Sequence, residues 1–255
     1  MFPLRDDNPT ELVPFVTVLI IAINVMAWLL VQQAGAGQAF LTSLCQWGAI
    51  PGEITGRIGA GTTVPFGPRH ACRVGDTGLL TVLTSMFLHG GWMHLIGNMW
   101  FLWVFGNNIE DSMGHGRFVV FYLLCGVLAA AAHIASNPSS AVPTVGASGA
   151  ISGIMGAYLM LYPRVRVHTL LFLFIFVRIV LLPAWVLLLL WFGLQLVSGT
   201  LSAGAAGGVV AFWVHVGGFV AGVALIRLFA RPVLTEAKRE GEVLLRSELG
   251  RFRSW

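Results

Sequence analysis

Charged residues are scarce in this chain, and their scarcity excludes most soluble folds. Only 10% of the 255 residues are Asp, Glu, Lys or Arg, whereas soluble domains carry about a quarter. Hydrophobic residues make up 56% of the sequence, and the mean hydropathy is +0.81. The sequence therefore predicts a membrane protein. Its net charge of +4 comes from basic residues at helix ends and in the tail, so we expect the lipid bilayer and no nucleic acid as a partner.

Cysteine is also rare, with three residues in the chain. Cys125 lies inside an apolar run, where a free thiol packs as a small hydrophobic group. Cys45 and Cys72 lie in a long loop that we assign to the outside, so we expect a disulfide between them. No Cys/His spacing is typical of a zinc site, and no metal is expected.

The N-terminal stretch lacks the features of a signal or transit peptide, because residues 1–11 carry three acids and one arginine. The first apolar run is thus expected to remain as a span. We predict an all-α, polytopic bundle in which residues 13–229 form a six-helix membrane domain. A cytoplasmic N-terminus (1–12), a long external loop (35–90) and a helical cytoplasmic tail (230–255) complete the chain. The predicted spans are 13–33, 92–109, 117–135, 148–163, 182–199 and 205–228.

The nearly apolar segment 168–182 is ambiguous, because as a separate span it would give seven crossings. With six spans and the N-terminus inside, twelve Lys and Arg lie on the cytoplasmic side and three outside. Seven spans would place the basic tail outside, against the positive-inside rule. We therefore interpret 168–182 as an interfacial segment or a lead into the fifth helix. The expected location is a plasma membrane of the bacterial type.

Polar side chains from three predicted spans fall at one depth. At about 1.5 Å per residue from each cytoplasmic anchor, Asn98 lies ~18 Å up its helix, Ser148 ~21 Å, His215 ~18 Å and His94 ~24 Å. Polar groups inside a membrane are costly and usually functional. This layer lies below the outer surface of a core about 30 Å thick.

The chemistry of this layer suits nucleophilic catalysis. Ser148 needs a base to take its proton, and the imidazole of His215 serves near neutral pH. His94 and Asn98 share one helix face and could donate hydrogen bonds to an oxyanion, together with the Ser148 backbone N–H. Small residues should let the serine and histidine helices approach closely. These residues are Gly149, Gly153, Gly218 and Gly222.

Structural roles remain as alternatives for each residue taken singly. His133 falls at a similar depth and is expected to be a packing or hydrogen-bonding histidine. His89 and His94 could be metal ligands, but their five-residue spacing does not share a helix face and no carboxylate accompanies them. Ser152, one turn after Ser148, could be the important hydroxyl instead.

These motifs together resemble the rhomboid intramembrane serine proteases. The matching stretches are Gly146–Gly149, the histidines and Asn98 within Phe87–Trp100, Glu110 with Gly114, and His215 with Gly218 and Gly222. The resemblance covers roughly residues 79–229.

The resemblance implies a six-helix catalytic core with a Ser–His dyad and no third acidic member. Ser148 would be the nucleophile, His215 the general base, and His94, Asn98 and the Ser148 N–H the oxyanion hole. His89 would be a structural histidine. The family cleaves proteins in or near transmembrane helices, without metal or cofactor.

Two departures from the family pattern concern positioning rather than catalytic atoms. Leu80 and Thr81 replace a Trp-Arg pair often found in the first loop. Ser152 stands where some members place a tyrosine against the catalytic histidine, which leaves open what orients His215.

Two other functions compete with a protease. A rhomboid-like protein that binds membrane helices without cutting them would be expected to lack the serine or the histidine, and this chain has both. A transporter or channel would be expected to carry carboxylates within its spans, which contain almost none. The natural substrate and the oligomeric state stay open.

Overall fold

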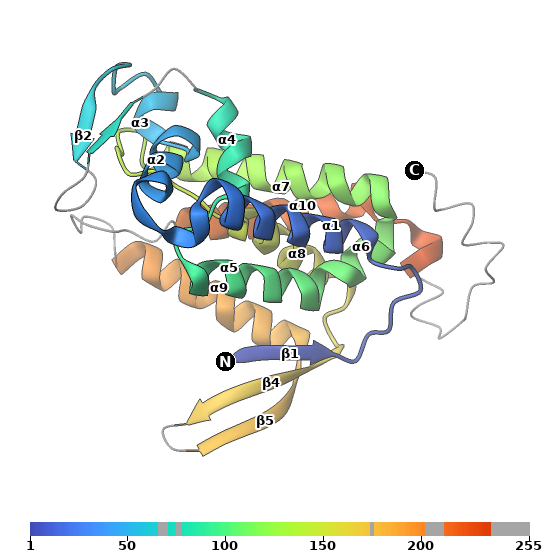
Figure 1. Cartoon of the computed structure of the whole chain (residues 1–255). Coiled ribbons are helices and arrows are strands. Elements are labelled where there is room, and N and C mark those ends of the chain that lie inside the picture. The colour runs from blue at the N-terminus through green and yellow to red at the C-terminus, as the bar shows by residue number, and fades with distance from the viewer. Residues whose placement is uncertain (66–70, 75–77, 174–175, 202–211, 236–255) are drawn as a thin grey trace.

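The computed structural model describes residues 1–65, 71–74, 78–173, 176–201 and 212–235. Its long helices run side by side as a bundle (Figure 1). Helical segments lie in the described part of each predicted span, while the number of membrane crossings stays a prediction. They are α1 (Phe15–Met26) continued by η1 (Ala27–Val31); α5 (Trp92–Phe101), η4 (Leu102–Gly106) and α6 (Asn107–Met113) in succession; α7 (His115–Ser136); α8 (Ser148–Leu161); α9 (Ala184–Leu201); and α10 (Phe212–Phe229).

Two of the described helices, α7 and α10, are long and apolar enough to cross a membrane by themselves. The shorter apolar helices are Phe15–Val31, Ser148–Leu161 and Ala184–Ser198. Two predictions fall partly or wholly outside the described residues. These are the start of the sixth span, at 205–211, and the helical tail beyond residue 235.

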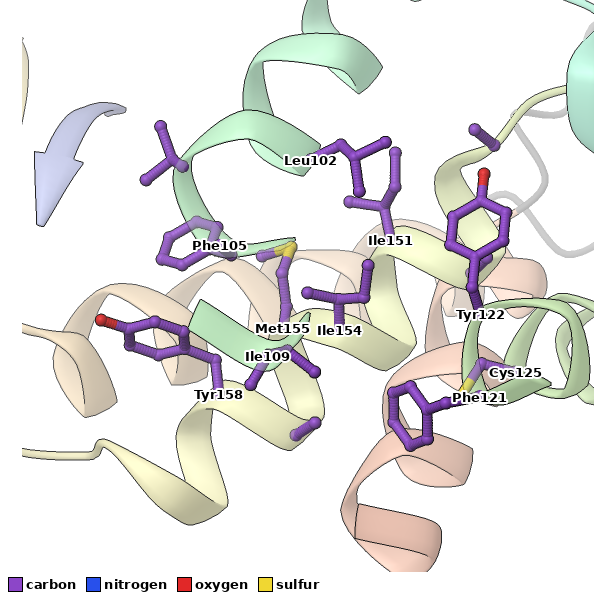
Figure 2. Packing of buried hydrophobic residues seen from close by; sticks show 14 of the residues in the cluster. Leu102, Phe105, Ile109, Phe121, Tyr122, Cys125, Ile151, Ile154, Met155 and Tyr158 are labelled. Atoms are coloured by element: carbon purple, nitrogen blue, oxygen red, sulfur yellow. The ribbon is translucent and has the colours of Figure 1, made fainter. Parts of the chain in front are cut away.

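Helix α8 lies at the centre of the bundle, where its residues 149–158 are all buried. Figure 2 shows its side chains packed against those of η4, α6 and α7. Lipid tails are as apolar as leucine, so this core is held by close van der Waals packing rather than by exclusion of water. The labelled members of the cluster are Leu102, Phe105, Ile109, Phe121, Tyr122, Cys125, Ile151, Ile154, Met155 and Tyr158.

The prediction of an all-α chain is wrong between α8 and α9. Strands β4 (Arg166–Leu173) and β5 (Phe176–Pro183) pair as an antiparallel hairpin, and β1 (Phe2–Asp6) adds to β4 as a third strand. The segment 168–182 is thus strand rather than helix; it ends where α9 begins, and its interfacial location stays a prediction. An apolar run alone does not distinguish helix from strand. Its β-branched residues, such as Val167, Thr169 and Ile179, favour the strand.

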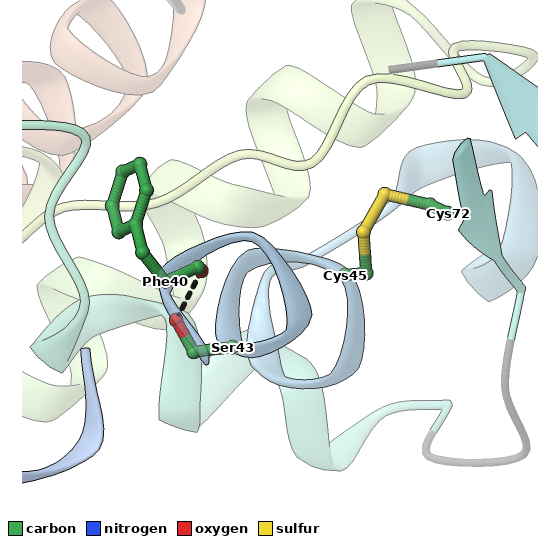
Figure 3. Close-up of a disulfide and its surroundings, with 4 residues drawn as sticks. All are labelled: Phe40, Ser43, Cys45 and Cys72. Atoms are coloured by element: carbon green, nitrogen blue, oxygen red, sulfur yellow. Dashed lines mark hydrogen bonds between the residues drawn. A yellow bond between two sulfur atoms is a disulfide. The ribbon is translucent and has the colours of Figure 1, made fainter. Parts of the chain in front are cut away.

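The described residues of the loop 35–90 contain helices and a short hairpin. After η2 (Gln33–Gly35), which ends at its first residue, the loop contains α2 (Gly37–Trp47), α3 (Pro51–Ile54), a hairpin of β2 (Thr63–Pro65) and β3 (Ala71–Arg73), α4 (Leu80–Thr84) and η3 (Ser85–Phe87). The expected disulfide is present and joins Cys45 on α2 to Cys72 on β3 (Figure 3).

This disulfide-linked region holds the loop that leads to α8. Ala49 and Thr144 exchange two backbone hydrogen bonds of 3.0 and 2.8 Å. The N–H of Gly52 donates to Ser140 O, and the N–H of Gly146 donates to Ser85 O. The residues just before Ser148 are therefore fixed by segments far away in the sequence.

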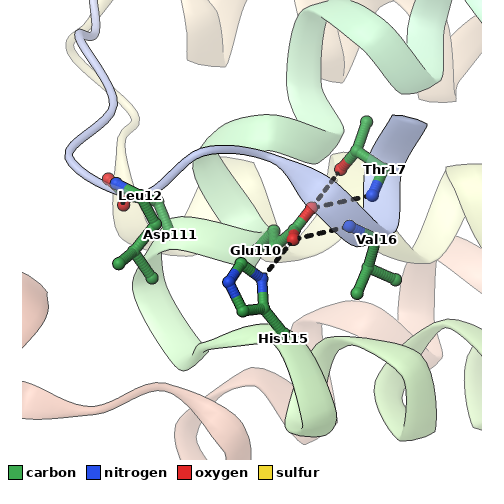
Figure 4. Close-up of polar contacts among 6 residues, drawn as sticks. All are labelled: Leu12, Val16, Thr17, Glu110, Asp111 and His115. Carbon is green, nitrogen blue, oxygen red and sulfur yellow. Dashed lines mark hydrogen bonds and ion pairs between the residues drawn. The ribbon is translucent and has the colours of Figure 1, made fainter. Parts of the chain in front are cut away.

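Helix α1 begins without a capping side chain of its own, because Pro14 precedes it and its first turn has no acidic residue. Glu110 of α6 supplies the missing acceptors (Figure 4). Its carboxylate accepts from the N–H groups of Val16 and Thr17 at 2.9 and 2.8 Å, and His115 Nδ1 lies 2.6 Å away. A fully buried carboxylate thus accepts hydrogen bonds from two N–H groups that the helix leaves free at its start. Its negative charge also lies at the positive end of the α1 dipole.

Candidate active site

Ser148 is the first residue of α8, and its hydroxyl meets the imidazole of His215. Ser148 Oγ lies 2.9 Å from His215 Nε2, across 67 residues of sequence. Both residues are half-buried, and His215 stands in the first turn of α10. A serine hydroxyl at this distance from an imidazole nitrogen can transfer its proton during attack on a carbonyl carbon.

Helix α9 contributes two contacts to His215 that the sequence interpretation missed. Gln195 Oε1 lies 2.7 Å from His215 Nδ1, and the Trp191 ring lies 5.8 Å from the imidazole between centroids. Depth could have identified Gln195. It stands eleven residues after Ala184, about 17 Å along its helix, which is close to the ~18 Å estimated for His215.

Gly146 brings the loop before Ser148 against His94. Its φ of +131° is rarely adopted by other residues, and a Cβ there would lie 2.7 Å from His94 Nε2 and 3.5 Å from Ser148 Oγ. His94 Nδ1 accepts a hydrogen bond of 3.2 Å from the Gly90 N–H. The proton of neutral His94 therefore resides on Nε2, which faces the loop as a donor.

Asn98 follows His94 by one turn on α5 and is 7% exposed. Among the described residues, its Nδ2 has no hydrogen-bond partner. Buried amides usually find partners, so a free donor at this position is compatible with a ligand or reaction intermediate as its acceptor. The Ser148 N–H lies at the start of α8, where backbone N–H groups are not used within the helix.

The other sequence candidates occupy separate positions. The Ser152 hydroxyl donates to Ser148 O at 2.6 Å and is buried within α8. His89 is fully buried before α5, where Gln32 bonds its backbone N–H and carbonyl at 2.8 Å each. Burial, with a smaller effect of nearby His94, lowers the pKa of His89 to about 3, so its ring stays neutral.

A small cavity of about 30 Å³ opens beside Ser148. Gly146, Gly149 and Val214 line it, and His133 of α7 is the one titratable side chain among the described lining residues. Such a volume accommodates about one water molecule or a methyl group. No cluster of three or more His, Cys, Asp or Glu that could hold a metal occurs in the described part of the chain.

Glycines set the distance between the serine and histidine helices. A Cβ on Gly218 would overlap the Gly149 carbonyl, and one on Gly222 would overlap the Gly153 carbonyl. On the facing side, a Cβ on Gly149 would lie 2.6 Å from Val214 Cγ1. The α8 and α10 backbones are thus in direct contact beside the site, as in other membrane helix pairs with small residues.

Comparison with known proteins identifies the family. The model of the rhomboid domain matches residues 76–232. Rhomboid protease GluP of Bacillus subtilis is 39% identical over 98 residues, which are 38% of this chain and 19% of that protein. Rhomboid-like protein 11, chloroplastic, of Arabidopsis thaliana is 39% identical over 72 residues, 28% of this chain and 25% of that protein.

The mouse presenilin-associated rhomboid-like protein, mitochondrial, is 32% identical over 87 residues, 33% of this chain and 23% of that protein. The chain thus spans about a quarter or less of the length of these three relatives. The rhomboid domain match covers more than half of the chain and includes every residue of the site described above. This chain belongs to the rhomboid family of integral membrane proteins.

Proposed function

We propose that this protein is an intramembrane serine endopeptidase that cleaves membrane proteins in or near their transmembrane helices. The observation that carries the proposal is the 2.9 Å contact between Ser148 Oγ and His215 Nε2. Polar side chains inside a membrane are energetically costly. A serine and a histidine that meet there from different helices therefore usually have a function. Family membership and relatives named rhomboid proteases support the same conclusion.

The mechanism follows from the positions of the donors and acceptors. Ser148 Oγ attacks the scissile carbonyl carbon while its proton moves to His215 Nε2. The resulting oxyanion accepts hydrogen bonds from the Ser148 N–H, His94 Nε2–H and Asn98 Nδ2. His215 then protonates the leaving amine. A water molecule, deprotonated by His215, hydrolyses the acyl-enzyme and regenerates Ser148.

A fluorophosphonate probe tests the nucleophile directly, since it reacts with activated serines. We expect the wild type to be labelled and to cleave a reconstituted single-span substrate. Ser148→Ala and His215→Ala should each abolish both activities, and the double variant should be no worse, because the two groups act as one unit. Ser152→Ala is the matched control and should keep labelling. Cleavage by Ser148→Ala would refute the assignment.

The alternative is a rhomboid-like protein that binds membrane helices without cutting them. Several relatives are named rhomboid-like without the word protease. The Ser148–His215 contact favours the protease, since helix binding alone does not need it. A folded wild type that retains a substrate helix but neither reacts with the probe nor cleaves would establish the alternative.

The active site is proposed to open to the outside, with both termini in the cytoplasm. The Cys45–Cys72 disulfide lies in the region that holds the loop before Ser148, and disulfides persist in oxidising compartments. The excess of Lys and Arg on the opposite side agrees with this orientation. Labelling a cysteine introduced at Ser254 from outside intact cells tests it, and strong labelling would overturn the topology.

A further inference from the structure

Both ring nitrogens of His215 are engaged, and by side chains from two different helices. Nε2 lies 2.9 Å from Ser148 Oγ on α8, and Nδ1 lies 2.7 Å from Gln195 Oε1 on α9. An amide oxygen only accepts hydrogen bonds, so this contact places the imidazole proton on Nδ1. The lone pair on Nε2 then faces the serine hydroxyl, which is the arrangement that a general base requires.

The opposite orientation of the Gln195 amide would have the opposite effect. Its NH₂ group would donate to Nδ1, and the imidazole proton would move to Nε2. Nε2 could then no longer accept the proton of Ser148. The contact of Oε1 with Nδ1 is therefore the one that leaves the base ready to act.

The surroundings of Gln195 hold the histidine from a second direction. Trp191 precedes Gln195 by four residues and so lies on the same face of α9. Its ring lies 5.8 Å from that of His215 and 6.3 Å from that of Phe219, both on α10. A polar amide in an otherwise apolar helix is costly unless it is hydrogen-bonded. Among the described residues, the side-chain amide of Gln195 makes this contact with His215.

We infer that Gln195 is the positioning residue for His215, a neutral third member that fixes its tautomer and ring orientation from α9. This inference rests on the proposed protease function. A carboxylate in this position would also stabilise the imidazolium by its charge, whereas an amide orients the ring without doing so. Helix α9 thereby becomes part of the catalytic arrangement, although it carries neither member of the dyad.

Two variants of the whole chain distinguish a role of Gln195 in orienting His215 from a general role in stabilising the fold. Gln195→Met keeps the length of the side chain but removes the amide oxygen. Gln195→Glu keeps the shape and adds a charge. Leu194→Met, at the neighbouring exposed position, is the matched control. The readouts are the rate of fluorophosphonate labelling against pH, and kcat and KM for a reconstituted substrate. Both are measured on the monodisperse fraction.

For Gln195→Met we expect labelling and kcat to fall about tenfold with KM within about twofold, as for the loss of one neutral hydrogen bond. For Gln195→Glu we expect an active enzyme. In its profile of labelling rate against pH, the acidic limb should move to higher pH by about one unit. The sign follows because a carboxylate beside the imidazole favours its protonated form, so the free base appears only at higher pH. His94 and His133, the other titratable groups that act on His215, are unchanged in both variants.

Two results would overturn the inference. One is a labelling rate of Gln195→Met within twofold of the wild-type rate. The other is a pH profile of Gln195→Glu whose acidic limb does not move. If Gln195→Met fails to fold, the pH profile of Gln195→Glu decides the question alone. A folded wild type that does not react with the probe at any pH would instead refute the proposed protease function. The two failures are therefore distinguishable.

Discussion

Gly218 on α10 lies directly against the carbonyl oxygen of Gly149 on α8, so that even a methyl group at residue 218 would overlap it. Gly149 follows the proposed nucleophile, and Gly218 is three residues after His215. The contact therefore sets the separation of the two helices at the level of the dyad. A change in this separation would move Ser148 Oγ away from Nε2.

Replacing this glycine tests the role of the contact. Gly218→Ala should lower the free energy of unfolding by about 1–3 kcal/mol, the usual cost of overpacking a core, and should reduce activity. Gly193→Ala on α9 is the matched control, because a Cβ there meets nothing within 4 Å. It should be neutral or stabilising by up to about 1 kcal/mol. Unfolding midpoints in one detergent would compare them, and equal midpoints would contradict the packing role.

Asn98→Ala should lower kcat about 10²-fold while leaving the fold intact, if its free Nδ2 donates to the oxyanion. KM should change little, because the developing charge exists only in the transition state. Steady-state kinetics with a reconstituted substrate measure both constants. A change in KM at constant kcat would instead assign Asn98 to substrate binding.

Glu110→Gln should destabilise the protein by about 1–3 kcal/mol, since an amide offers one acceptor oxygen in place of two. The buried carboxylate now accepts from Val16, Thr17 and His115, and it anchors the start of α1. Glu11→Gln, at an exposed side chain, is the control and should leave the unfolding midpoint unchanged. If both variants unfold at the same point, the cap of α1 contributes no net stability.

Cleavage should occur in the outer third of the substrate span or just outside it. Ser148 is estimated at ~21 Å above the cytoplasmic edge of a ~30 Å core, hence about 9 Å below the outer boundary. A helical substrate must unwind locally before attack, which Gly or Pro near the site makes easier. A small residue before the scissile bond should fit the cavity beside Ser148, which is about 30 Å³.

Mass spectrometry of the products from a reconstituted single-span substrate would locate this bond. Replacing the substrate's Gly and Pro residues with Leu should slow cleavage, while the same change at the cytoplasmic end of the span is the control. A cut at the cytoplasmic end, or one insensitive to these replacements, would contradict this account of the site's depth.

The positions of the helices could be predicted from the sequence because helical hydrogen bonds are local. Each N–H donates to the carbonyl four residues earlier, so the sequence of an apolar run by itself indicates where a helix forms. The same regularity made depth calculable, and it grouped Ser148 with His215 although they are 67 residues apart. The loop that Cys45 and Cys72 share made a disulfide between them possible, but only the structure shows that their geometry permits it.

Only the tertiary structure decided the features that depend on how distant segments meet. The sheet formed by β1, β4 and β5 needs the N-terminus to reach a strand more than 160 residues away, and hydrophobic periodicity alone does not distinguish such a strand from an apolar helix. Glu110 caps a helix to which it does not belong. Gln195 gains its role from facing His215 across a helix contact. Composition and spacing place a residue along its own helix, but packing alone determines which side chain lies opposite.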